Sequence, residues 1–300
     1  MPLPTTEIQT HGAAVDALTP HKAATAFLQG QQDALTSINA AIPAISDGAR
    51  RMADAIRAGG TIIYAAAGSS GLMALADGCE LPGTFGIAQS SVKIHMAGGV
   101  PADGTMPGDT EDDETAASEA ARDIRAIDVV IVLSASGTTP YALTIAKGAK
   151  AAGATVIAIA NNPDTPLLAL ADVSICLATP PEVITGSTRL GAGTAQKATL
   201  NMMSSMMGIH LGHVYQGMMV NVVADNAKLQ ERAKRIVALI ANVSRETAQT
   251  ALAKSNGNAK TAILIALGST PDVAAKLLEQ HAGHLKACIH SISSSQNVNV

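Results

Sequence analysis

Apolar runs that alternate with amphipathic segments constrain the fold of this chain more than any other feature. Short runs rich in β-branched residues predict buried strands, because they lack polar alternation. They lie at residues 61–68, 91–99, 128–136, 154–163 and 172–179. Segments with apolar residues three and four positions apart predict helices at 110–127 and 139–153. Strands that alternate with helices predict an α/β fold with a parallel sheet flanked by helices on both faces.

The pattern of elements also predicts three parts of the chain. Residues 1–57 form an N-terminal helical segment, and residues 58–225 contain the sheet and end in a long, Met-rich helix at 192–216. Residues 226–300 form a helical C-terminal subdomain, whose last ten residues we expect to be frayed.

Two strand-to-helix junctions are rich in glycine and hydroxyl residues. A helix N-terminus offers unpaired N–H groups and the positive end of its dipole, so such junctions favour phosphate. The alternative is that the hydroxyls only cap the helices. Two such junctions in one parallel sheet favour the anion site, because ligands bind at the carboxyl ends of the strands. The candidate binding residues are Gly68, Ser69, Ser70, Ser134, Ser136, Gly137 and Thr139.

A third polar segment, residues 183–197, precedes and opens the Met-rich helix. Its polar side chains have the chemistry to contact a sugar or its phosphate. The alternative is a capping loop, in which Thr194 is a suitable N-cap. The candidates for sugar contacts are Thr185, Ser187, Thr188 and Arg189.

Carboxylates occur in two settings near these junctions. Glu80 lies in the apolar stretch "DGCELPGTFG", where we expect partial shielding from water to suit it to acid–base work. A surface glutamate at a helix end is the alternative. Residues 111–114, "EDDE", are expected to open a helix, where acidic residues complement the helix dipole.

Composition excludes several classes of protein. The net charge is −4, no dense basic run occurs, and aromatic residues make up 2% of the chain, which disfavours nucleic-acid binding. No apolar run reaches the length of a membrane span, and the N-terminus lacks the pattern of a secretory signal. Three widely spaced cysteines fit a reducing cytoplasm. Histidine pairs at 210/213 and 281/284 have no nearby carboxylate or cysteine that completes a ligand set, so no metal site is predicted.

Longer motifs resemble one known family. The segment "TGSTR-x-x-AGTAQK-x-x-LNM" at 185–203, with "DGCELPGTFG", "ASGTTPY" and "N-x-KL-x-ER" at 226–232, resembles the N-acetylmuramic acid 6-phosphate etherases. These belong to the sugar isomerase (SIS) superfamily, and the resemblance covers nearly the whole chain. It implies a flavodoxin-like three-layer sandwich with a small helical C-terminal appendix. It also implies cleavage of the lactyl ether of N-acetylmuramic acid 6-phosphate to N-acetylglucosamine 6-phosphate and D-lactate. The family uses no metal or organic cofactor, forms homodimers with a site near the interface, and serves cell-wall recycling.

The resemblance also assigns roles to residues. Glu80 stands at the position of the family's principal catalytic glutamate, and Glu111 matches a second active-site glutamate, which replaces its interpretation as solvated charge. Ser69, Ser70, Ser136 and Thr139 match phosphate contacts of the superfamily. Ser134 restores the superfamily pattern Ser-x-Ser-Gly-x-Thr.

Four positions depart from the family's motifs. Leu72 and Thr138 replace arginines, Gly191 replaces a lysine, and Thr10 replaces an asparagine in the N-terminal pattern that begins at Thr6-Glu7. Loss of cations weakens attraction for a phosphate or a lactyl carboxylate, so the substrate could be a related phosphorylated amino sugar. Two alternatives therefore stay open, a sugar-phosphate isomerase and a non-catalytic sugar-phosphate sensor of the same superfamily.

Overall fold

The computed structural model describes residues 5–9, 14–106, 108–222, 224 and 226–297. They form two compact units: Met1–Cys79 with Ser90–Met206, and Glu80–Gln89 with Met207–Val300. Thr10 lies outside the described residues. The division of the chain into three parts by sequence pattern stays a prediction.

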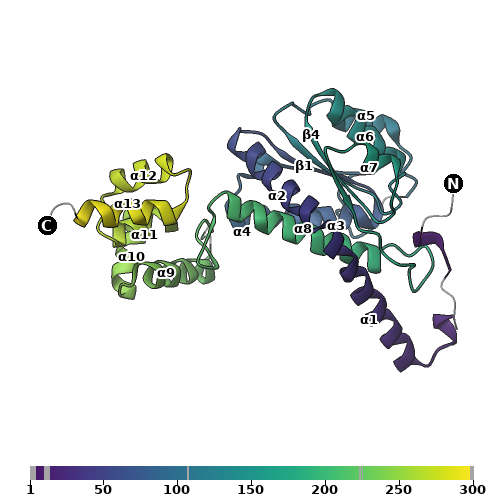
Figure 1. Cartoon of the computed structure of the whole chain (residues 1–300), viewed down its shortest axis with the longest axis horizontal. Helices are drawn as coiled ribbons and strands as arrows, with labels where there is room; N and C mark the ends of the chain where they lie inside the picture. Colours follow the sequence, from purple (N-terminus) through teal and green to yellow (C-terminus); the bar gives the residue numbers. More distant parts are fainter. Residues whose placement is uncertain (1–4, 10–13, 107, 223, 225, 298–300) are drawn as a thin grey trace. The chain divides into compact units, whose positions relative to one another are not determined.

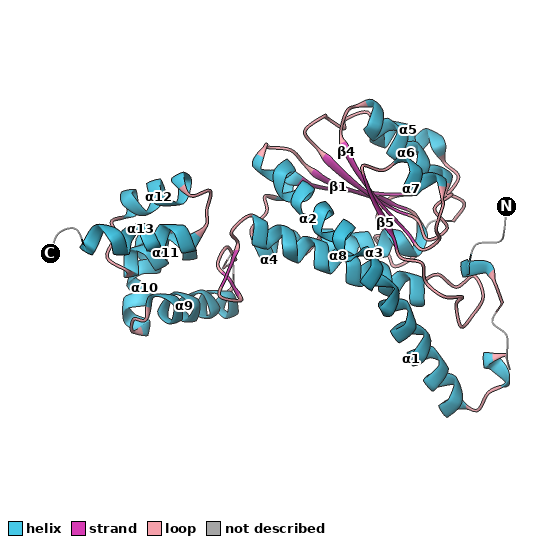
Figure 2. Ribbon diagram, in the orientation of Figure 1, coloured by secondary structure: helices cyan, strands magenta, loops and turns pink. Residues whose placement is uncertain are grey.

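The first unit is built on a five-stranded parallel sheet (Figure 2). The strands are β1 (Ile62–Ala66), β2 (Val92–Met96), β3 (Val129–Leu133), β4 (Thr155–Ala160) and β5 (Val173–Cys176). Every residue of β1 and β3 is buried, as the continuous apolar runs predict. The order β2-β1-β3-β4-β5 is the flavodoxin-like order, which confirms the predicted fold class. Its switch point lies between β1 and β3, so a ligand is expected at their carboxyl ends.

Helices cover both faces of this sheet (Figure 1). On one face, α5 (Glu114–Ala121), α6 (Pro140–Ala151) and α7 (Pro166–Leu170) pack on alternate strand residues such as Val130 and Val156. On the other lie α2 (Ile42–Arg57), α3 (Gly68–Gly78) and the first part of α8 (Gly191–His210), where Met203 contacts Gly48 of α2. The chain thus forms the three layers that an α/β sheet requires.

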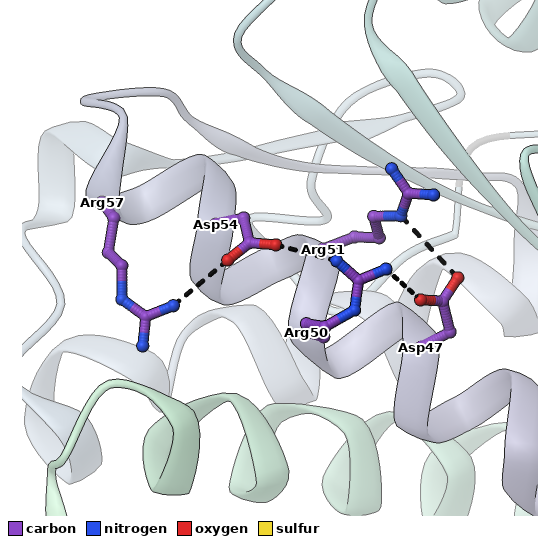
Figure 3. Close-up of polar contacts among 5 residues, drawn as sticks. All are labelled: Asp47, Arg50, Arg51, Asp54 and Arg57. Atoms are coloured by element: carbon purple, nitrogen blue, oxygen red, sulfur yellow. Dashed lines mark hydrogen bonds and ion pairs between the residues drawn. The ribbon is translucent and has the colours of Figure 1, made fainter.

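The outer side of α2 carries a ladder of exposed ion pairs (Figure 3). Arg50 pairs with Asp47 and with Asp54, the latter at 3.0 Å, and Arg57 contacts Asp54 at 3.1 Å. Arg51 lies 3.7 Å from Asp47. Exposed pairs of this kind contribute little to stability, so the buried face of α2 holds the helix in place.

Helix α1 (Pro20–Thr36) extends beyond the sheet in Figure 1. Ala34 is its one buried residue, whereas Leu28 is 60% exposed and Leu35 41% exposed. These two leucines are seven positions apart and therefore lie on the same face of the helix. The first unit alone leaves this apolar face uncovered.

The second unit contains α4 (Leu81–Phe85) and a bundle of short helices. These are α9 (Ala227–Ala241), α10 (Arg245–Lys254), α11 (Ala259–Ala266), α12 (Pro271–Gln280) and α13 (Leu285–Asn297). Their core includes Val237, Leu252, Ile263 and Leu285. The helical C-terminal appendix is thereby confirmed, but α13 continues through residues 291–297, which the sequence predicted to be frayed.

Two predicted helices are shorter in the structure. The Met-rich helix was predicted to continue to residue 216, but α8 ends at His210, because Gly212 has φ +68° and lies against the carbonyl of Gly283. A hairpin of β6 (Val214–Tyr215) and β7 (Met218–Met219) follows, with both turn residues at positive φ. Helix α5 begins at Glu114, not at residue 110, because the carboxylate of Asp113 accepts a hydrogen bond from the Ala116 N–H as N-cap.

Within the described ranges, no single helix is long and apolar enough to cross a membrane. Helices α11 and α12 are long and apolar enough only when taken together, and the chain bends by 118° between them.

Candidate functional site

The first serine junction is the first turn of α3. Strand β1 ends at Ala66 and α3 begins at Gly68, so only Ala67 separates strand and helix. Gly68 has φ +53°, a conformation that glycine adopts without strain. The N–H groups of Gly68, Ser69 and Ser70 belong to the first turn, which has no acceptor within the helix. Ser69 is half-buried and Ser70 is buried.

The second junction joins β3 to α6, and its hydroxyls contact one another. Ser134 Oγ is buried, lies 2.8 Å from Thr139 Oγ1, and accepts a hydrogen bond from the Gly137 N–H at 3.0 Å. Ser136 Oγ accepts from the N–H and the hydroxyl of Thr138, at 3.2 and 2.9 Å. Gly137 has φ +71°, and a Cβ there would lie 2.4 Å from Thr165, so glycine is required. Ser134 therefore holds the shape of the loop.

Neither junction uses its hydroxyls to cap its helix. The N-cap of α3 is Ala67, and Thr139, the N-cap of α6, makes no side-chain cap hydrogen bond. The capping alternative for these serines and threonines is therefore wrong. The first turn of α3 keeps N–H groups that an anion can bind. In α6, Pro140 has no N–H and the Tyr141 N–H donates to a backbone carbonyl.

Glu111 lies beside the first junction. Its Oε1 is 2.7 Å from the point where a Cβ on Gly68 would be, and its carbonyl oxygen accepts a hydrogen bond from the Tyr141 N–H at 3.0 Å. Tyr141 belongs to the first turn of α6, so Glu111 connects both junctions. Burial, together with the charge of Asp113, raises the pKa of the Tyr141 hydroxyl. Glu111 precedes α5 and is not part of its first turn, contrary to its interpretation as a helix-opening acid.

The third polar segment is held by a buried carboxylate. Glu182, 4% exposed, accepts hydrogen bonds from the N–H groups of Gly191 and Ala192, each at 2.9 Å, and so caps α8. Thr194 lies inside α8, where its hydroxyl donates to Gln31, so the predicted Thr194 N-cap is wrong. Ser187 and Thr188 are half-buried in the segment that Glu182 anchors, and Thr185 and Arg189 are exposed in it.

Glu80 belongs to the second unit, where it flanks α4. Its carbonyl oxygen accepts a hydrogen bond from the Thr84 N–H at 2.9 Å. Its side chain is exposed, so the predicted shielding of this carboxylate is absent in the single chain.

A buried carboxylate that sequence reasoning missed lies three residues before Glu80. Asp77 is 2% exposed and accepts hydrogen bonds from Tyr64 Oη at 2.8 Å, Asn201 Nδ2 at 2.9 Å and Ser204 Oγ at 3.1 Å. Burial raises the pKa of Asp77 despite these donors, and burial beside Asp77 also raises the pKa of Tyr64. An aspartate among apolar residues of a predicted helix was the signal that could have identified it.

The three positions at which the family's motifs have arginine or lysine lie in different surroundings. Leu72 is half-buried in α3, and Thr138 is exposed with its hydroxyl on Ser136. At Gly191 a Cβ would lie 3.2 Å from Glu182 Oε2 and 3.1 Å from Ala34 Cβ. Across the described part of the chain, no three histidine, cysteine or acidic side chains group as metal ligands.

Comparisons with known proteins show the family and the fold of this chain. The SIS domain family model matches residues 104–210. The N-acetylmuramic acid 6-phosphate etherase of Deinococcus radiodurans is 38% identical over 291 residues, 95% of this chain and 94% of that protein. The etherase of Streptomyces avermitilis is 42% identical over 84% of this chain and 82% of its own length. A capsule-formation protein of Bacteroides fragilis, suggested to be a phosphosugar isomerase, superposes with a TM-score of 0.51 at 19% identity. It covers 66% of this chain and 95% of its own, and it shows the fold alone.

Proposed function

This chain belongs to the N-acetylmuramic acid 6-phosphate etherase family, and on that premise we propose that it cleaves the lactyl ether of N-acetylmuramic acid 6-phosphate. The products are N-acetylglucosamine 6-phosphate and D-lactate, and the reaction is that of a carbon–oxygen lyase in cell-wall recycling. Identity of about 40% to etherases along nearly the whole chain carries this proposal. The two serine junctions at the β1/β3 switch point support it, because their N–H and hydroxyl groups are suited to bind the phosphate.

The phosphate binds at the two serine junctions. The first turn of α3 supplies N–H groups and the hydroxyls of Ser69 and Ser70, and the β3–α6 loop supplies Ser136 and Thr139. Gly68 and Gly137 allow the backbone to approach the phosphate oxygens, and Ser134 keeps the loop in shape. Ser187 and Thr188 contact the sugar.

The two glutamates perform the acid–base chemistry. The C2 proton is weakly acidic next to the aldehyde of the ring-opened sugar, so a carboxylate removes it and the C3–O bond to lactate breaks. A carboxylic acid protonates the leaving oxygen, and water then adds to the double bond. We assign these proton transfers to Glu80, as the resemblance implies, and a supporting role to Glu111, whose carboxylate lies against the first turn of α3.

The neutral residues at positions 72, 138 and 191 affect affinity more than chemistry. Each removes a cation that would attract phosphate or the lactyl carboxylate, so binding is weaker or a related phosphorylated amino sugar is preferred. The enzyme is a homodimer, which the uncovered leucines of α1 support, and it acts in the cytoplasm, which the free state of its cysteines supports.

Product analysis tests the proposed function. The purified protein should release D-lactate from N-acetylmuramic acid 6-phosphate, and Glu80→Gln or Glu111→Gln should reduce kcat at least about 100-fold. Glu119→Gln, an exposed glutamate on α5, is the matched control. An aldose–ketose product without lactate would support an isomerase instead. Thermal stabilisation by sugar phosphates without any turnover would support a sensor.

A further inference from the structure

The N-terminal residues 5–7 are bonded across the carboxyl edge of the sheet. Thr6 is 1% exposed, and its carbonyl oxygen accepts a hydrogen bond from the Gly186 N–H at 2.8 Å. Thr5 donates to Asn162 Oδ1 from its N–H at 2.7 Å and from its hydroxyl at 2.9 Å. Residues 5–7 are therefore held against the edge of the sheet where the candidate site lies.

Asn162 links these residues to the second serine junction. It is 4% exposed, and its Nδ2 donates at 2.8 Å to the carbonyl of Ala135, between Ser134 and Ser136. The same carbonyl accepts the N–H of Asn161 at 3.0 Å. Three hydrogen bonds through the side-chain amide of Asn162 thus connect Thr5 to the loop proposed to bind phosphate.

Glu7 extends from this anchored segment toward the third polar segment. Its Oε2 lies 3.1 Å from the point where a Cβ on Gly186 would be, directly before Ser187 and Thr188. Residue 186 is a glycine, so no side chain there separates the carboxylate from the loop, and its φ of +75° disfavours any other residue. Among the residues that the structure describes, none forms an ion pair or a hydrogen bond with the Glu7 carboxylate. Both of its oxygens are therefore able to accept hydrogen bonds from a ligand.

Charge decides which part of a ligand can face Glu7. The phosphate and the lactyl carboxylate are anions and would be repelled by a nearby carboxylate. Sugar hydroxyl groups and the acetamido N–H are neutral donors, and hydrogen bonds from such donors to an ionised acceptor are strong. The carboxylate therefore suits the uncharged part of a sugar whose phosphate is bound at the serine junctions.

We infer that Glu7 is a specificity-determining residue that accepts a hydrogen bond from a neutral donor of the sugar, a hydroxyl or the acetamido N–H. This inference rests on the proposed function, since it assumes a sugar phosphate in the site. It assigns Glu7 no proton transfer.

Calorimetric binding tests this role without requiring turnover. N-acetylglucosamine 6-phosphate, glucose 6-phosphate and inorganic phosphate are titrated into wild type, Glu7→Ala and Glu7→Gln, with Asp16→Asn as the control at another exposed N-terminal acid. Glu7→Ala should raise the Kd of N-acetylglucosamine 6-phosphate about tenfold or more and leave that of inorganic phosphate within about twofold. An equal rise in the Kd of glucose 6-phosphate identifies a hydroxyl as the donor. A smaller rise in that Kd identifies the acetamido N–H.

Three outcomes would overturn the inference. They are an unchanged Kd for both sugar phosphates in Glu7→Ala, an equal loss of inorganic phosphate binding, and no binding of either sugar phosphate to the wild type. An equal loss would mean that Glu7 only supports the loop. If Glu7→Ala melts at a lower temperature than the wild type, the near-isosteric Glu7→Gln takes its place in the comparison, because it removes the charge and keeps the shape of the side chain. Failure of the proposed function is a separate result, seen as no lactate release by a wild type that binds both sugars.

Discussion

The carboxylate of Glu111 occupies the space that a side chain on residue 68 would need. Oε1 lies 2.7 Å from that Cβ position, and Gly68 adopts φ +53°. Glycine at the head of α3 therefore does more than permit a turn, because it leaves room for an acidic group beside the proposed phosphate site.

Gly68→Ala is expected to displace Glu111 and lower kcat for lactate release at least about tenfold. The left-handed backbone adds about 1 kcal/mol of strain, while the carboxylate itself moves at little cost. Gly59→Ala is the matched control, because Gly59 has φ +74° with nothing within 4 Å of its Cβ position. Both variants should lose similar stability in urea, and only Gly68→Ala should lose activity. Equal kcat values for the two would contradict the role given to Glu111.

Asp77→Asn should change how stability depends on pH. Burial raises the pKa of Asp77 in the folded chain above its unfolded value of about 3.9, so the folded state holds the proton more tightly. The wild type therefore loses stability relative to the variant as pH rises from about 4 through the raised pKa. Urea denaturation from pH 4 to 8 measures this difference, with Asp33→Asn on the exposed surface of α1 as control. A constant difference across that range would refute the prediction.

Lys260→Met should stabilise the second unit at neutral pH. Lys260 is 5% exposed on α11, and burial lowers its pKa from 10.5 to about 8. The cost of burying the charged amine is complete below pH 8 and is relieved as pH rises to 10.5, which corresponds to about 3 kcal/mol at most. Denaturation at pH 7 and pH 10 should show the gain of the variant shrinking. Lys254→Met, at an exposed position of α10, should show no such trend.

Glu substitutions at Leu28 and Leu35 should convert the proposed dimer into monomers. These leucines form the uncovered face of α1, and paired charges there would oppose burial against a second copy. Sedimentation equilibrium measures the change, and Lys22→Glu, on a different side of α1, is the control. A wild type that is monomeric at micromolar concentration would remove the basis of this prediction.

The sheet and its ligand edge were predictable because their signals are local. Continuous apolar runs locate β1 and β3, and glycine with hydroxyls directly after each run locates the two junctions. Glu111 was different: its neighbours suggest only a solvated helix start, and the resemblance was needed to single it out. The structure then placed it against Gly68.

Contacts between distant residues were not predictable from pattern. The apolar residues around Asp77 could indicate a buried carboxylate, but its partners Asn201 and Ser204 lie in α8, more than a hundred positions away, so the sequence near Asp77 does not identify them. The N-cap of α8 was misassigned to Thr194 for the same reason. A capping residue is normally sought next to the helix, whereas Glu182 reaches Gly191 from nine positions earlier.

That Glu182 cap also bears on the direction in which a substrate can enter. N-acetylmuramic acid 6-phosphate carries two anionic ends, and the N-terminus of α8 already holds a carboxylate of the chain itself. The N-termini of α3 and α6 have no such side-chain cap. The chain thus satisfies the N-terminus of α8 internally, whereas the proposed phosphate site uses the other two helix ends. Under the proposed function, a phosphate placed at the N-terminus of α8 would be repelled by the carboxylate of Glu182.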